Sequence, residues 1–513
     1  MKNRLFFLLL IFIFNQAPAQ TAAGHDFVVK AFHLDLRIQA MTMPALKVFA
    51  QQLQQGGINT LILEYEATYP YQKHPLIANR YAYTKREISS FIAFCDQLGI
   101  DVIPLQQSFG HVEYILRHYQ YAALREDKKE LSQVCPLETA GDSVLFTDLY
   151  TELTAAHRSR YIHIGGDETW LLGHCAKCRA KAEKEGISKL YIDYINMLCR
   201  IAIRLGKRPV LWADIALKYP EALQLLPKEI IFVDWNYGWA LNRFGDHQKL
   251  VESGFEIWGA PALRSSPDNY FLTQWEKHFN NIRDFVPMAR QLGYKGIVMT
   301  SWSTSGAYSY LYESEDNMSQ LYAIRQVYPI TGFNILLAAF MKSIITSEPL
   351  NTEAFIAGYC AKAYGFTALQ ARNFWQALKI TPYEVEGGMV KSPVPLSLSA
   401  LADSVTKAAN VFHNLKPLKG REEFEQYRLM ADIRVQYIRF LEIEKQVNAN
   451  HFKQDEIPSI LQKLQALMTT ATLLDQRFIA LNKSSFYVSE LKAANQYRNR
   501  KLQLLYEQLC KIR

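Results

Sequence analysis

The chain has 513 residues, of which 49% are hydrophobic and 21% charged, and its formal net charge is +8. This composition excludes a disordered chain, and the length exceeds one ordinary core, so we expect two domains or one large barrel with an appendage. Lysine and arginine are scattered and do not cluster among aromatic residues, which argues against a nucleic-acid partner.

The N-terminus has the pattern of an export signal. Two basic residues among the first four precede a ten-residue apolar run, 5–14, and an Ala-Pro-Ala tripeptide follows that ends at Ala19. The run is shorter than the roughly 20 apolar residues of a membrane-spanning helix. We therefore predict a signal peptide over residues 1–19 and an exported chain, periplasmic or extracellular, without stable membrane insertion.

From residue 25 to residue 345, short apolar runs rich in β-branched residues alternate with longer amphipathic stretches. This alternation is typical of parallel βα units. No Gly-rich phosphate loop follows the first run, which argues against an open doubly wound sheet. Eight candidate strands are the number that closes a (β/α)8 barrel, so we predict this fold over residues 25–345. The predicted strands cover residues 27–36, 58–65, 100–107, 160–166, 208–214, 229–235, 255–261 and 295–302.

The pattern changes beyond residue 345. Short helical segments and a connector that contains proline and serine occupy residues 346–395, and nearly continuous helical periodicity fills residues 396–513. We predict a C-terminal, mainly α-helical domain whose amphipathic helices pack on one another or on the barrel. We expect it to be a structural support, with carbohydrate binding or dimerisation as the alternative. No oligomeric state is predicted.

The seven cysteines are too few for a disulfide scaffold in so long a chain. Cys175 and Cys178 form the only close pair, and His174 lies beside them. This could be half of a zinc site, but no second CxxC or HxxxH motif is present to complete four ligands. A local disulfide or a thiol pair that shapes a loop is therefore favoured, and no metal or cofactor is predicted.

Barrel enzymes build their sites at the C-terminal ends of the strands, so these positions matter most. Four of the eight tryptophans fall at the ends of the last four predicted strands. An aromatic wall for the apolar face of a ligand, such as a sugar ring, explains this clustering better than core packing. The candidate site residues at the strand ends are Arg37, His111, Asp167, Glu168, Trp212, Asp214, Trp235, Tyr237, Trp258 and Trp302.

The stretch YIHIGGDETW, residues 161–170, places two carboxylates directly after two glycines. In a regular strand Asp167 and Glu168 would point to opposite faces, but the glycines relax the backbone and let both reach one ligand. Repulsion and partial burial are expected to raise the pKa of one of them, which would make it a general acid. The pair suits substrate assistance, in which the 2-acetamido oxygen of the substrate is the nucleophile.

The motif HIGGDE, residues 163–168, resembles the signature of glycoside hydrolase family 20, the β-N-acetylhexosaminidases. Further segments narrow the resemblance to the hexosaminidase D-like branch. They are HLDLR (33–37), LILEYEATYPY (61–71), VIPLQQSFGHVEYILR (102–117) and VLWAD (210–214). The resemblance covers the barrel and follows the order of motifs in the family.

This resemblance implies an exo-acting, retaining hydrolase that removes terminal GlcNAc or GalNAc from glycans, without a metal or cofactor. Glu168 is the implied general acid and base, and Asp167 orients the acetamide and stabilises the oxazolinium. Arg37 is implied to bind sugar hydroxyls, and His111 to position the acid. The implied walls of the acetamido pocket are Trp235, Trp258 and Trp302.

The segment after the last strand, WSTSGAYSY, lacks the acidic residue that many relatives carry two positions beyond the tryptophan. Recognition of the O4 and O6 hydroxyls is therefore left open, with Tyr308 and Glu313 as candidates. Neither the choice between GlcNAc and GalNAc nor the natural glycan is predicted.

Two other functions are compatible with the residues. A non-catalytic glycan-binding barrel would keep the tryptophans and lose the chemistry, although the intact acidic pair argues against it. A metal-dependent hydrolase would use His163, Asp167, His174 and the cysteine pair. His163 lies within the strand, however, where a hydrogen-bonded core histidine is the expected role.

Overall fold

The structure is a computed structural model, and it describes residues 26–37, 40–302, 308–310, 321–323, 329–380 and 382–512. The predicted signal peptide, residues 1–19, and Glu313 lie outside the described residues. Within them, every helix is too short or too polar to cross a lipid bilayer.

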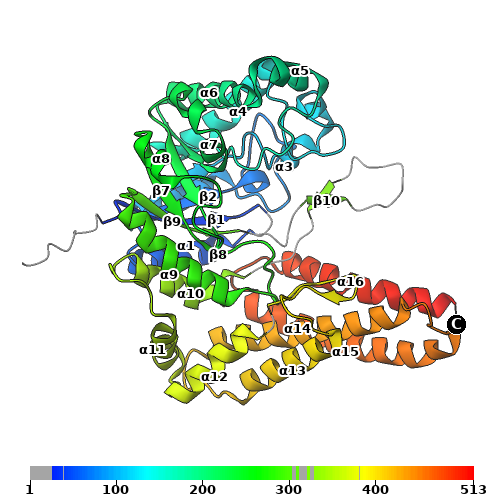
Figure 1. Cartoon of the computed structure of the whole chain (residues 1–513). Helices are drawn as coiled ribbons and strands as arrows, with labels where there is room; N and C mark the ends of the chain where they lie inside the picture. The colour runs from blue at the N-terminus through cyan, green and yellow to red at the C-terminus, as the bar shows by residue number, and fades with distance from the viewer. Residues whose placement is uncertain are drawn as a thin grey trace, which may run out of the picture.

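Eight parallel strands close into a barrel (Figure 1). They are β1 (Val29–Asp35), β2 (Thr60–Glu64), β3 (Asp101–Leu105), β4 (Tyr161–His163), β5 (Arg208–Trp212), β6 (Ile231–Trp235), β7 (Glu256–Ala260) and β9 (Gly296–Ser301). The barrel closes because β1 pairs in parallel with β2 on one side and with β9 on the other. The predicted (β/α)8 fold is thus confirmed, and each predicted strand contains one of these eight.

One short strand has no counterpart among the predicted ones. β8 (Ala262–Arg264) follows β7 and pairs in parallel with the end of β9. Three residues carry no readable period of hydrophobicity, so a strand of this length cannot be told from a loop in the sequence. β8 matters because it delivers the next two residues to the C-terminal end of the barrel.

The helices that follow the strands cover the outside of the barrel. They are α1 (Met43–Gln55), α2 (Lys85–Gln97), α3 (Glu113–Leu116), α4 (Thr139–Ala156), α5 (Ala176–Glu185), α6 (Ile187–Arg204), α7 (Asp214–Lys218), α8 (His247–Glu252), α9 (Trp275–Gln291) and α10 (Asn334–Ser343). α2 illustrates their construction. Thr84 and Glu87 form a capping box at its start, and Ile88, Phe91 and Cys95 are buried along one face.

Alternation along the strands divides the core into two layers. In β1, Ala31 points into the barrel, whereas Phe32 and Leu34 pack outward in the core that the helices cover. The interior layer is completed by side chains such as Ile62, Ile103, Tyr161, Val210, Ile231, Trp258 and Val298. The barrel is therefore filled, and open space can occur only above the strand ends.

The C-terminal part is mainly helical (Figure 1). It contains α11 (Thr352–Tyr364), α12 (Ala368–Lys379), α13 (Leu398–Asn414), α14 (Arg421–Val447), α15 (Ile457–Asn482) and α16 (Val488–Lys511). The connector before α13 holds a small antiparallel hairpin of β12 (Val385–Glu386) and β13 (Met389–Val390), and a second antiparallel pair joins β10 (Tyr308–Tyr310) to β11 (Leu321–Ala323). Helices α13 to α16 share an apolar core that includes Leu401, Ile438, Ile460 and Leu464.

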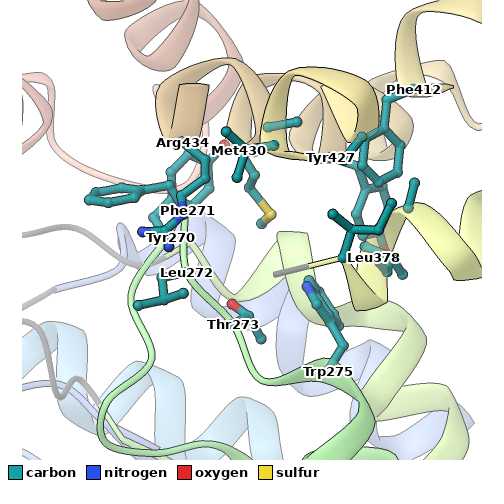
Figure 2. A pocket seen from close by; sticks show the side chains of 15 residues that line it. Tyr270, Phe271, Leu272, Thr273, Trp275, Leu378, Phe412, Tyr427, Met430 and Arg434 are labelled. Atoms are coloured by element: carbon teal, nitrogen blue, oxygen red, sulfur yellow. The ribbon is translucent and has the colours of Figure 1, made fainter. Parts of the chain in front are cut away.

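These helices pack directly on the barrel. The hydroxyl of Tyr270, in the loop before α9, donates a hydrogen bond of 2.6 Å to Gln426 Oε1 of α14. A small cavity of about 70 Å³ lies at this contact. Figure 2 shows the side chains that line it, which come from the segment around Trp275 and from α12 to α14. Most of the residues that line it are apolar, and several of them, such as Trp275 and Tyr427, belong to the same core as the barrel helices. The barrel helices and the first C-terminal helices therefore share one core.

Candidate active site

A cavity of about 200 Å³ lies at the C-terminal end of the barrel. Seven of the ten candidate residues line it, together with three that sequence analysis missed. The lining residues are Arg37, His111, Asp167, Glu168, Trp235, Tyr237, Trp239, Ser265, Ser266 and Trp302. The other three candidates, Trp212, Asp214 and Trp258, do not line it.

The glycine doublet after β4 gives the chain its course at the cavity. Gly165 and Gly166 have φ angles of 75° and 93°, in the region that favours glycine. A side chain on Gly166 would meet Leu211 at 2.6 Å, and one on Gly165 would collide with Gln107. The hydroxyl of Tyr191 also donates to the carbonyl of Gly166 at 3.1 Å. The strand therefore bends here, and both acidic side chains that follow reach the same cavity.

His111 bridges the two carboxylates. Its Nε2 lies 3.3 Å from Asp167 Oδ2 and 3.4 Å from Glu168 Oε2. Burial lowers the pKa of His111, but the charge of Asp167 and the hydrogen bonds to both carboxylates outweigh it and hold this pKa well above its ordinary value. In turn, the hydrogen bond and charge of His111 lower the pKa of Glu168 against the effect of burial. His111 is thus a cation shared by two anions.

The raised carboxyl pKa expected at this site belongs to a third acid. Burial, followed by the charge of Asp167, raises the pKa of Asp214 to about 7. Asp214 Oδ2 accepts a hydrogen bond of 3.1 Å from the backbone N–H of Glu168, and Oδ1 accepts one of 3.3 Å from Trp235 Nε1. Asp214 therefore positions the general-acid candidate and one wall of the cavity from behind. The expectation of a raised pKa within the adjacent pair is not met by Glu168, because the hydrogen bond and charge of His111 outweigh the effect of burial.

Aromatic rings form one wall of the cavity. Trp235 and Tyr237 stack with their centroids 4.9 Å apart, and Tyr237 lies 5.5 Å from Trp239. The indole N–H of Trp302 donates a hydrogen bond of 2.8 Å to the hydroxyl of Tyr237. Trp239 was missed because it lies four residues beyond the end of β6, where no strand period predicts its direction. The wall is apolar and held in place by its own contacts.

Trp258 does not lie at the cavity, contrary to the prediction. It is fully buried inside the barrel, 5.5 Å from the ring of Tyr161, where the absence of a side chain at Gly296 leaves room for the indole. Its Nε1 donates to Glu256 Oε1 at 3.0 Å. Trp258 is the third residue of a five-residue strand, so its inward direction places it within the barrel and not at its rim.

Trp212 lies beneath the cavity floor. Its ring is 4.4 Å from His163 and 5.5 Å from Trp302, and its side chain is fully buried. His163 is likewise buried in the barrel, its pKa lowered to about 3 by burial and by nearby His33, and its Nδ1 accepts the backbone N–H of Gly165 at 3.1 Å. His163 is therefore a core histidine that supports the glycine bend, as the strand position indicated.

A buried polar network extends below Arg37. His33 Nε2 lies 2.8 Å from Glu64 Oε2, and Gln107 Nε2 donates to Glu64 Oε1 at 3.1 Å. Burial raises the pKa of Glu64, but the hydrogen bond from His33 and the charge of Arg37 overcome it and hold this pKa at about 2. Glu64 is therefore an anion under the cavity at neutral pH. Glu64 is the last residue of β2 and was not among the candidate site residues.

Arg37 is fixed at the rim by its neighbours. Its Nε donates to Asp35 Oδ2 at 2.8 Å, and its guanidinium lies 5.7 Å from the centroid of the Trp302 ring. Burial lowers the pKa of Arg37, but the charges of Asp35 and Glu64 outweigh burial and raise this pKa above its ordinary value. The guanidinium is a fixed cation that can donate to hydroxyl oxygens.

Comparison with known proteins identifies the family of the chain. Residues 41–316 match the model of the catalytic domain of glycosyl hydrolase family 20. The chain belongs to this family, and it carries a glycoside hydrolase catalytic domain.

Two of the similar proteins are named hexosaminidase D. Hexosaminidase D from Bos taurus is 28% identical over 303 residues, which cover 56% of this chain and 87% of the bovine protein. Hexosaminidase D from Homo sapiens is 27% identical, and the match covers 56% of this chain and 62% of the human protein. Among solved structures, β-N-acetylhexosaminidase from Bacteroides fragilis aligns with a TM-score of 0.48 at 17% identity, over 65% of this chain and 69% of that one. The resemblance to the hexosaminidase D-like branch is confirmed.

Proposed function

We propose that the protein is an exo-acting, retaining β-N-acetylhexosaminidase that uses the 2-acetamido group of its substrate as the nucleophile. The observation that carries the proposal is the adjacent pair Asp167 and Glu168, which both face one cavity and share His111. Two neighbouring acids can serve one sugar in this way, whereas a direct-displacement enzyme uses carboxyl groups from separate positions around the bond.

Asp167 is suited to the acetamide. Its Oδ2 faces His111, while its Oδ1 is buried and has no hydrogen-bond partner among the described residues. An unsatisfied buried acceptor costs free energy, and an amide N–H in the cavity removes that cost. The same carboxylate then stabilises the positive charge of the oxazolinium that forms when the acetamido oxygen attacks C1.

Glu168 is suited to proton transfer. It lines the cavity, and its side chain keeps 35% of its exposure, so the leaving-group oxygen can approach it. His111 lowers the pKa of Glu168 in the free site, but a bound sugar displaces water, and desolvation raises the pKa of a carboxyl. Protonated Glu168 donates to the leaving oxygen, and the carboxylate then activates the water that opens the oxazolinium.

The shape of the cavity supports exo action on a single terminal sugar. Its volume of about 200 Å³ is small, and Trp235, Tyr237 and Trp302 line it. Such rings pack against the apolar face of a sugar and the acetamido methyl. Two relatives carry the name hexosaminidase D, which supports the same substrate class. Terminal GlcNAc and GalNAc are both candidate substrates.

The test compares chromogenic β-GlcNAc and β-GalNAc glycosides with the matching β-glucoside. Hydrolysis should require the N-acetyl group, a thiazoline analogue of the oxazolinium should inhibit, and Glu168→Gln should lower kcat by about 10²–10⁴-fold. Glu276→Gln, an exposed carboxylate on α9, is the control and should retain activity. Equal cleavage of the glucoside would exclude substrate assistance. Calorimetric binding without product would instead identify a glycan-binding barrel.

We infer from the N-terminal pattern that the protein is exported and that residues 1–19 are removed. The basic start, the short apolar run and the Ala-Pro-Ala tripeptide support this inference. Mass spectrometry of the mature chain from the native cell should find an N-terminus at Gln20. An intact Met1 in the purified protein would contradict it.

A further inference from the structure

Three thiols and one carboxylate lie together outside the active site. Cys135 and Glu126 come from the loop between β3 and α4, whereas Cys175 and Cys178 lie at the start of α5. One ligand atom of each residue lies within 4.8 Å of all the others. No other group of three or more His, Cys, Asp and Glu side chains is so placed in the part of the chain that the structure describes.

The distances within this cluster fit a bound ion better than a disulfide. Cys135 Sγ lies 3.8 Å from Cys175 Sγ and 3.5 Å from Cys178 Sγ. A Zn–S distance of about 2.3 Å in a tetrahedron requires sulfur atoms about 3.8 Å apart, whereas a disulfide requires about 2.05 Å. Cys178 Sγ lies 3.3 Å from Glu126 Oε2, close to the edge of about 3.6 Å for one sulfur and one oxygen ligand.

The surroundings of the cluster favour a cation. Cys135, Cys178 and Glu126 are buried, and Glu126 forms no ion pair with another described residue. A buried carboxylate without an ion-pair partner is unfavourable, and a bound cation would remove that cost. The backbone N–H of Cys178 points at Cys175 Sγ, 3.4 Å away, and that of Cys175 donates to Glu126 Oε1 at 2.7 Å. Such backbone hydrogen bonds orient the ligand atoms.

We propose that Glu126, Cys135, Cys175 and Cys178 bind one Zn²⁺ in a closed, structural site. Four protein ligands complete a tetrahedron and leave no position for water or substrate, so the ion would stabilise the fold and take no part in hydrolysis. Sequence analysis found only half of this ligand set because Cys135 lies 40 residues before Cys175 and belongs to no motif.

The site would clamp together the two loops that build the active site. The loop after β3 carries His111, and the loop after β4 carries Asp167 and Glu168. They already touch, since the backbone N–H of Leu171 donates to Gln133 Oε1 at 3.0 Å. There is no room at Gly110 for a side chain, which would meet the carbonyl oxygen of Asp167 at 2.5 Å. Loss of the ion should therefore loosen the placement of His111 against the acidic pair.

Metal analysis of the full-length protein, purified without added zinc or chelator, tests the site. We expect one zinc per chain, and a chelator such as phenanthroline should remove it and lower the Tm by at least about 5 °C. Cys175→Ala should lose the zinc, whereas Cys175→His should retain it because imidazole is also a zinc ligand. Cys360→Ala removes a buried thiol from α11 and should leave the zinc content unchanged.

A disulfide is the competing outcome, and alkylation under denaturing conditions with chelator but without reductant distinguishes it. The zinc site predicts that all seven cysteines react, whereas a disulfide in this cluster leaves five. A chain that contains a disulfide and no metal, or that takes up no zinc after reduction and incubation with zinc chloride, would overturn the proposal. Zinc content does not depend on the proposed hydrolase function, so an inactive protein with one zinc per chain would count against that function alone.

Discussion

Two clusters of acidic side chains lie on the same pair of loops and differ in what surrounds them. In the catalytic cluster, Asp167 and Glu168 face a cavity, and Asp167 Oδ1 has no partner among the described residues. In the thiol cluster, Cys135, Cys178 and Glu126 are buried and face one another. The first cluster leaves a hydrogen-bond acceptor free for a substrate. The second cluster turns the ligand atoms of all its members toward one internal point. We call the first cluster open, because its free acceptor suits catalysis, and the second cluster closed, because its converging ligand atoms suit a structural role.

Asp167→Asn tests the open cluster with the largest expected effect. We expect kcat toward β-N-acetylhexosaminides to fall by about 10²–10³-fold, because the variant cannot stabilise the charge of the oxazolinium. The Tm should change little, since the substitution removes the repulsion of Asp214 and also gives up the ion pair with His111. Steady-state kinetics and thermal unfolding measure the two effects.

A variant of the thiol cluster is compared with Asp167→Asn by its effect on the Tm. Cys175→Ala should lower the Tm, which Asp167→Asn should not. If Asp167→Asn unfolded the protein as readily as loss of a thiol, the distinction between open and closed clusters would be wrong.

Glu64 tests whether the polar network under the cavity behaves as a closed cluster. Its pKa falls from 4.5 to about 2 in the folded protein, so it stabilises the fold above about pH 4.5, and this stability is lost as the pH falls toward 2. We expect the free energy of unfolding of the wild type to lose about 2–3 kcal/mol more than that of Glu64→Gln over this range. Urea unfolding at several pH values measures it, and parallel curves for the two proteins would refute the prediction.

Local patterns in the sequence predict the barrel and much of the site. Each strand carries its own run of apolar residues, and the motif around Gly165 and Gly166 holds the acidic pair within a few positions. These features need no knowledge of tertiary contacts, because a period of two and a glycine bend are properties of neighbouring residues.

Features that arise from contacts between distant segments could not be predicted. Ser265 and Ser266 reach the cavity only through a three-residue strand, and Cys135 meets Cys178 only because two loops pack together. Whether Trp258 lies at the rim or inside the barrel depends on where β7 ends. Trp258 lies two residues before the last residue of β7, and its side chain is therefore inside the barrel. Single-residue precision in strand ends is the part that periodicity does not provide.

Two tryptophans allow the same comparison with smaller expected effects, because Trp235 lines the cavity and Trp258 is buried inside the barrel. Trp235→Phe should raise KM about 3–10-fold, because the ring lines the cavity, and should change stability little. Trp258→Phe should lower the free energy of unfolding by about 1–2 kcal/mol, because it leaves a void inside the barrel, with KM unchanged. Steady-state kinetics and urea unfolding of both variants test this. A raised KM in Trp258→Phe without a loss of stability would mean that Trp258 contacts the substrate.

His111→Gln tests the electrostatic link inside the catalytic cluster and should have the smallest effect. His111 holds the pKa of Glu168 below its ordinary value, so its removal should raise that pKa. The general acid then stays protonated to higher pH, and the alkaline limb of the kcat/KM profile should move to higher pH with only a modest loss of height. His118→Gln is the matched control. Burial, followed by the charge of Arg117, lowers the pKa of His118 to about 4, and its side chain does not line the cavity, so the control should leave the limb in place. An alkaline limb that moves to lower pH in His111→Gln would mean that His111 does not hold Glu168 ionised, and the shared-cation description of the site would fail.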